Sequence, residues 1–186
     1  MDLSEAETEI SLRERLRRET AAAHERVDGL FGSADLSDEH GYGRFLLAQA
    51  RAWESLRPRL DAGSIARADA LRADLAALGL DRPRPLATSL PAKLSIGHLY
   101  VLEGSRLGST LLLRDLAAAS PSLARRAGAY LTESARIDAW RQLSTRLQMD
   151  QNGYDRADEI IDDALFVFAL FERAWQATDS AHLKVS

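Results

Sequence analysis

The stretch IGHLYVLEGSRLGST, residues 96–110, carries three glycines inside a pattern that is otherwise typical of a helix. Each glycine in a helix interior costs about 1 kcal/mol relative to alanine, so their presence needs an explanation. At about 100° per residue, Gly97, Gly104 and Gly108 lie within about 40° of one another on the helix surface. This stripe without side chains lets a flat molecule approach the backbone closely. It also suits close packing against another helix, and the residues alone leave both interpretations open.

Helical periodicity continues on both sides of this stretch. Ser11 and Glu14 have the spacing of a capping box and predict that a first helix begins there and ends near Gly29. No strand with sustained alternation and no internal repeat is visible, which favours one all-α domain, a bundle of about seven helices over residues 1–186. The ends, residues 1–10 and 179–186, are expected to be frayed. The other predicted helices cover residues 39–60, 64–78, 91–118, a fifth beginning at 120–121, 133–147 and 155–176.

The composition excludes several classes of protein. The 186 residues include no cysteine, which excludes a disulfide scaffold, thiolate catalysis and cysteine-ligated metal. The net charge of −4 argues against a nucleic-acid binder. The best apolar run, residues 164–170, is too short to span a bilayer, and residues 1–10 lack the features of a signal peptide. We therefore expect a cytoplasmic protein that binds neither nucleic acid nor membrane.

Two side chains of the first predicted helix lie on nearly the same side of it, at the edge of its apolar stripe. These are Arg17 and His24, which are seven residues apart and so about 10 Å apart along the axis. That spacing is comparable to the distance from the centre of a porphyrin to its propionate edge. A neutral imidazole can bind iron, and a guanidinium can bind a carboxylate. The alternatives are a hydrogen-bonded boundary histidine and a solvated run of arginines, because Arg17 lies close to Arg13, Arg15 and Arg18.

Taken together, these segments resemble the bacterial haem oxygenases, the biliverdin-producing family that includes enzymes partnered with bacteriophytochromes. Residues 16–24 (LRRETAAAH) look like the proximal helix of that family, and residues 99–108 (LYVLEGSRLG) look like its distal helix. The two motifs occur in the family's order, about 80 residues apart, and the resemblance covers residues 12–175. It implies an all-α, haem oxygenase-like fold.

The resemblance also implies roles for individual residues. His24 matches the proximal iron ligand, and Gly104 and Gly108 match the glycines whose backbone faces the distal side of the haem. Arg17 matches a basic residue that pairs with a propionate. Tyr100 matches a tyrosine that contacts a propionate in some bacterial members.

The C-terminal part and the distal serines carry the remaining expectations. Family members often use a further C-terminal arginine, for which Arg141 and Arg146 are the candidates. Ser105 stands where mammalian members carry an aspartate, and Ser109 where many members carry a second glycine. The resemblance therefore implies a differently anchored distal water network, in which Ser105 acts beside the two distal glycines.

The reaction implied by the resemblance uses haem b as both substrate and cofactor. Dioxygen, with electrons from an external reductase or ferredoxin, converts it to biliverdin, carbon monoxide and iron, and a bacteriophytochrome is a possible biliverdin acceptor. One competing hypothesis is a non-catalytic haem carrier or sensor on the same fold, suggested by Ser109. Another is a helical protein-interaction module without haem. The attacked meso carbon, the reductant, the biological purpose and the oligomeric state stay open.

Overall fold

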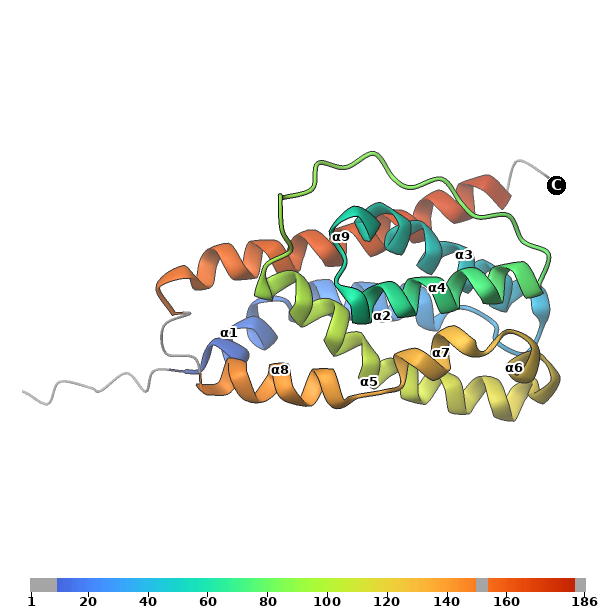
Figure 1. Cartoon of the computed structure of the whole chain (residues 1–186), viewed down its shortest axis with the longest axis horizontal. Coiled ribbons are helices and arrows are strands. Elements are labelled where there is room, and N and C mark those ends of the chain that lie inside the picture. Colours follow the sequence, from blue (N-terminus) through green and yellow to red (C-terminus); the bar gives the residue numbers. More distant parts are fainter. Residues whose placement is uncertain (1–9, 150–153, 183–186) are drawn as a thin grey trace, which may run out of the picture.

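The computed structural model describes residues 10–149 and 154–182, and of residues 154 and 179–182 only the backbone is described. The described chain is helical with connecting turns and loops and contains no strand, which confirms the predicted all-α class. Figure 1 shows its elements. They are α1 (Leu12–Glu19), α2 (Ala21–Gly32), α3 (Glu39–Leu56), η1 (Arg57–Arg59), α4 (Ala62–Ala77), α5 (Ile96–Ala119), α6 (Pro121–Ala127), α7 (Ala129–Ser134), α8 (Asp138–Met149), η2 (Tyr154–Arg156) and α9 (Ala157–His182).

The predicted first helix is two helices, separated at Thr20. Its φ of −100° and ψ of 0° lie at the edge of the right-handed helical region, and backbone hydrogen bonds continue on both sides of it. The Thr20 hydroxyl donates to the carbonyl of Leu16 at 2.7 Å, the kind of side-chain bond that competes with helical pairing. Arg17 and His24 therefore belong to different helices, and a wheel drawn for one straight helix does not fix their relative directions.

The helix with the three glycines begins at Ile96, later than Pro91 predicts. Its first turn has a capping box, in which the Ser95 hydroxyl accepts from the Gly97 amide at 3.1 Å and His98 Nδ1 accepts from the Ser95 amide at 3.1 Å. His98 is buried, and burial lowers the pKa of its imidazole, which keeps Nδ1 free to accept. This cap fixes where α5 begins.

The other helix boundaries differ from the sequence prediction by a few residues. Asp61, not Ser64, caps α4, because its carboxylate accepts from the Ser64 amide at 2.8 Å. The predicted helix 133–147 begins only at Asp138, since α7 ends at Ser134. The last helix continues to His182, so the backbone at 179–182, expected to be frayed, is helical. The expected frayed residues 1–9 and 183–186 lie outside the described chain.

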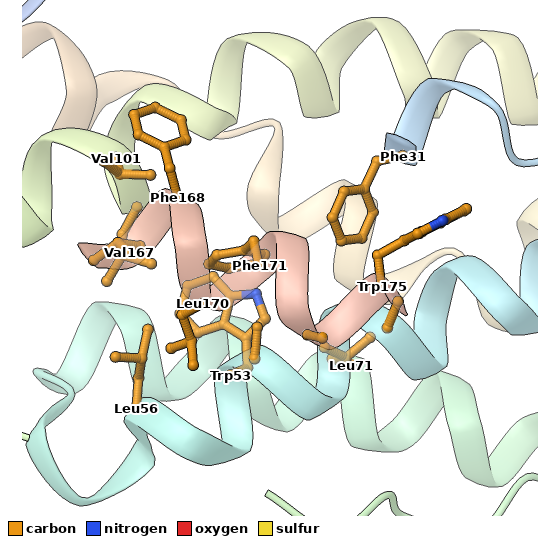
Figure 2. Close-up of a cluster of buried hydrophobic side chains, with 14 of the residues drawn as sticks. Phe31, Trp53, Leu56, Leu71, Val101, Val167, Phe168, Leu170, Phe171 and Trp175 are labelled. Atoms are coloured by element: carbon orange, nitrogen blue, oxygen red, sulfur yellow. The ribbon is translucent and has the colours of Figure 1, made fainter. Parts of the chain in front are cut away.

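The core forms around α9, which packs against α2, α3 and α5. Figure 2 shows Trp53 of α3 beside Phe171 of α9, and Phe31 of α2 beside Trp175 of α9. Their ring centroids are 6.4 and 5.0 Å apart, respectively. Such aromatic side chains bury about 150–250 Å² each, so these contacts hold α2 and α3 firmly against α9.

An irregular segment, residues 79–95, arcs over α3 and α9 before α5 begins (Figure 1). The amide of Leu86 donates to the Ser55 hydroxyl at 2.8 Å, and Arg82 forms an ion pair with Glu54 at 2.8 Å. Arg72 of α4 binds the same carboxylate at 2.6 and 2.8 Å, so Glu54 joins the segment to two helices. Of the helices described, none combines the length and apolar character that crossing a bilayer would take.

Candidate functional site

A cavity of about 650 Å³ opens between α2 and α5. Residues of α1, α3, α7, α8 and α9 complete its walls. Its lining includes His24 on α2, and Gly104 and Gly108 on α5, so the two motifs of the sequence meet at one site. A second hollow of about 470 Å³ lies against α4, α6 and α7, and none of the predicted site residues lines it.

His24 lies at the mouth of the cavity, with 57% of its side chain exposed. Its ring meets the Phe168 ring edge-on at a centroid distance of 5.7 Å, which orients the imidazole against α9. Its Nε2 is 3.4 Å from a carboxylate oxygen of Asp28, one turn further along α2. An exposed pair of this kind contributes about 0–1 kcal/mol, so Nε2 can exchange it for a stronger ligand at small cost.

The three glycines of α5 divide between two roles, although they share one helix face. A Cβ at Gly97 would overlap the carbonyl oxygen of Ile160, so this glycine permits close packing of α5 on α9. A Cβ at Gly104 would lie 3.4 Å from the Trp140 ring, and no described atom lies within 4 Å of one at Gly108. Of the two interpretations that the sequence leaves open, close helix packing therefore holds at Gly97, and the bare surface holds fully only at Gly108, whose missing side chain leaves open space.

One end of the cavity is cationic. Arg17 lines it, as the sequence suggests, and its exposed guanidinium binds Glu14 at 2.7 Å. Arg13 also lines it and donates to Gln148 at 3.1 Å. Arg13 was not among the predicted site residues, because a run of arginines is typical of a solvated face. It lies one turn before Arg17 on the same face of the helix.

Tyr100 contributes a neutral phenol at this cationic end. Burial raises the pKa of Tyr100, and the Thr20 hydroxyl and the charges of Arg13 and Arg17 only partly offset that rise. The phenol therefore stays protonated and can donate a hydrogen bond to an anion. Its ring packs on Trp140 of α8 at a centroid distance of 5.8 Å.

The structure does not bring Arg141 to the site. Arg141 is exposed and contacts Asp138 at 3.4 Å, and neither it nor Arg146 is among the described residues that line the cavity. Helix α8 reaches the cavity through Trp140 instead. The reason is helical geometry: Arg141 points about 100° away from its neighbour, so a helix that presents Trp140 turns Arg141 to solvent.

The serines beside the distal glycines have their hydroxyl protons committed to helix carbonyls. Ser105 donates to the carbonyl of Leu102 at 2.8 Å, and Ser109 donates to the carbonyl of Ser105 at 3.0 Å. Both line the cavity. Toward a molecule in the cavity their oxygens can therefore only accept hydrogen bonds.

The inner wall holds a polar group that the sequence analysis missed. The Tyr130 hydroxyl of α7 accepts from the Trp53 indole at 3.1 Å and donates to the Gln49 carbonyl oxygen at 2.8 Å. Tyr130 and Gln49 line the cavity, and no sequence motif links these residues of two helices. Most of the remaining wall is apolar, formed by Val27, Phe31, Phe45, Val101, Leu112, Phe168 and Phe171.

This arrangement suits a flat, largely apolar molecule with acidic groups at one edge. Helix α2 offers an imidazole with the carboxylates of Glu25 and Asp28, α5 offers open backbone at Gly108, and the cationic end offers two guanidinium groups and a phenol. Pockets for small ligands generally combine an apolar lining with a few placed polar groups in this way.

Comparisons with known proteins agree with this geometry. A family model described as "Heme oxygenase" matches residues 80–177, slightly more than half of the chain. The heme oxygenase PigA of Pseudomonas aeruginosa is 36% identical over 120 residues, which are 56% of this chain and 61% of PigA. The chain thus aligns with less than two thirds of that relative's length.

A solved structure shows a similar fold. The NO- and CO-bound heme oxygenase of Neisseria meningitidis superimposes with a TM-score of 0.70 and 24% sequence identity, over 90% of this chain and 92% of that one. The matched family region contains the whole of α5, including Gly104 and Gly108. From the extent of that match, the chain belongs to the haem oxygenase family.

Proposed function

We propose that this chain acts as a haem oxygenase: it binds haem b between α2 and α5 and, with dioxygen and external electrons, opens the ring to biliverdin, carbon monoxide and iron. The observation that carries the proposal is that His24 of α2 and Gly108 of α5 line one cavity. Family membership supports the same reaction.

The residues of the cavity fit this substrate. The volume of about 650 Å³ lies within the range of cofactor sites, and the walls are mostly apolar. His24 would hold the iron, and if it does so through Nε2, Asp28 gives up its contact. Arg13, Arg17 and Tyr100 would hold the propionates.

Bound haem supplies both the iron that activates dioxygen and the ring that is oxidised. The chain contributes position and environment. The missing side chain of Gly108 leaves room on the wall opposite His24, and aromatic side chains exclude bulk water from the inner end. Ser105 and Ser109 can anchor a water that donates to them.

The orientation of the ring would follow from the cationic end. Because Arg13, Arg17 and Tyr100 line the cavity and Arg141 does not, these three side chains would hold the propionates. The meso carbon that is oxidised would then depend on the ring rotation that they allow. Because the haem oxygenases generally need an electron donor, we include a ferredoxin or a reductase as a partner. We also propose a bacteriophytochrome as an acceptor of the biliverdin and the cytoplasm as the location.

Reconstitution with hemin tests the proposal. The wild-type chain should give a Soret band, and His24→Ala should lose the band or shift it strongly. His40→Ala is the matched control, because His40 is exposed and does not line the cavity. Adding ascorbate or reduced ferredoxin under air should then yield biliverdin, identified by absorption and chromatography.

The outcomes separate the competing hypotheses. A haem carrier or sensor would bind hemin through His24 and return it intact after reduction. An interaction module would give no spectral change with hemin. Either result would overturn the proposed activity.

A further inference from the structure

The side chain of Arg67 is wholly buried, with 0% exposed, although it carries a charge. It extends from α4 to the back of the wall formed by α5. Its Nη1 donates to the Leu102 carbonyl at 2.6 Å, and its Nη2 donates to the Ser105 hydroxyl oxygen at 3.0 Å. Its Nε donates to the Ser134 hydroxyl at 3.0 Å, and the guanidinium lies 4.6 Å from the centre of the Trp53 ring.

None of these four partners is a carboxylate. The nearby buried acid, Glu103, is bound by its own ion pair with Arg106 on the same helix. Glu103 is therefore paired with Arg106, and the hydrogen-bond partners of Arg67 are uncharged. Burial lowers the pKa of Arg67, and so does the charge of Arg106, while Tyr130 and the charge of Glu103 oppose that effect. A buried cation is costly unless its hydrogen bonds are satisfied, so its contacts define its role.

The contacts of Arg67 decide what Ser105 can do. The Leu102 carbonyl has no proton, so the Ser105 hydroxyl must donate to it, and the same oxygen accepts from Arg67. One lone pair remains, and any polar contact between this oxygen and a molecule in the cavity must use it. Without Arg67 the hydroxyl could rotate, and the Leu102 carbonyl would lose its strongest partner.

We propose that Arg67 is a positioning residue that fixes Ser105 as a hydrogen-bond acceptor at the cavity and holds the α5 backbone at Leu102. A water seated there donates one proton to Ser105 and keeps the other for a ligand opposite His24. The buried positive charge of Arg67 also favours the reduced state of bound iron, so its charge and its hydrogen bonds are tested with separate variants. The role of the water rests on the proposed function, whereas the hold on α5 does not.

Three variants separate the contributions. Arg67→Lys keeps the charge but loses the planar set of guanidinium donors. Arg67→Gln keeps some hydrogen bonding but loses the charge, and Arg67→Met loses both. Arg72→Lys is the matched control on α4, because Arg72 binds Glu54 and does not line the cavity.

The first measurement uses haem-free protein. Amide hydrogen exchange at residues 102–109 should be about tenfold faster in all three Arg67 variants and unchanged in the Arg72 variant, because a charge-assisted bond to the backbone is lost or weakened. If the Met variant does not fold, the Lys and Gln variants carry the test. Unchanged exchange in folded variants would overturn the hold on α5, whatever the chain does with haem.

The second measurement uses hemin-loaded protein and needs no turnover. The ferric–ferrous midpoint potential should be lower in Arg67→Gln than in the wild type and restored in Arg67→Lys, because a buried positive charge favours the added electron. Equal potentials in the Lys and Gln variants would overturn the electrostatic part. If the wild type does not bind hemin, that result would count against the proposed function, and the hydrogen-exchange result would still stand.

Discussion

Alanine substitutions along one face of α5 should change stability in opposite directions. At Gly108 a Cβ meets no described atom within 4 Å, so Gly108→Ala gains the helix propensity of alanine, about 1 kcal/mol. At Gly97 the Cβ overlaps a backbone carbonyl of α9, which no side-chain rotation relieves. Overpacking of this kind costs about 3 kcal/mol, and the propensity gain reduces the net loss to about 2 kcal/mol.

Thermal unfolding of the haem-free protein, followed by circular dichroism, measures both effects. For a chain of this length, 1 kcal/mol corresponds to about 2–4 °C, so Gly108→Ala should melt about 2–4 °C higher and Gly97→Ala about 4–8 °C lower. Gly29→Ala on α2 is the matched control, because its Cβ also meets open space and it does not line the cavity.

The same variants should separate stability from activity. Gly29→Ala should be stabilised and keep full hemin turnover, whereas Gly108→Ala should lose about tenfold or more, because its methyl occupies the wall opposite His24. A lower melting temperature for Gly108→Ala, or an unchanged one for Gly97→Ala, would refute the division of the glycines into cavity and packing positions.

Three further predictions rest on side chains outside α5's glycine face or at the cavity's rim. Arg17→Met should weaken hemin binding about tenfold in a spectroscopic titration while Arg141→Met leaves it unchanged, and equal effects would contradict the cationic end. Burial lowers the folded-state pKa of His98, so the unfolded chain takes up the proton first as the pH falls. The free energy of unfolding should therefore decrease below about pH 6.5. Urea unfolding at several pH values should show a smaller decrease in His98→Gln. Glu54→Gln should destabilise the fold by about 1–3 kcal/mol in the same assay, because two arginines lose a buried anion, and no change would show that segment 79–95 is held by its other contacts.

Local patterns in the sequence predicted the helical class and the main residues of the site. The spacing of Ser11 and Glu14 marked the start of α1, where the Ser11 hydroxyl accepts from the Glu14 amide at 3.2 Å. The glycines at 104 and 108 and the histidine at 24 line the cavity, as the resemblance implies. The cap is a signal within one helix turn, which spacing alone carries, whereas the roles of the histidine and the glycines came from the resemblance.

The parts that sequence reasoning missed depend on contacts between distant segments. Arg67 and Tyr130 become relevant only because α4 and α7 pack behind α5, and no spacing within α4 or α7 records that. Gly97 shares its face with Gly108, yet what lies opposite each is set by the course of α9. Arg141 does not line the cavity for a simpler reason, because α8 presents Trp140 there.

Helix α5 meets α9 most closely near its first turn. At Gly97 its backbone rests directly on the Ile160 carbonyl, with no side chain between them to yield, while three turns later Gly108 has free space beside it. Bulk added at Gly97 would push α5 away from α9, whereas bulk added at Gly108 would only occupy free space. The distance between these two helices is thus set by the absence of a single carbon atom at position 97.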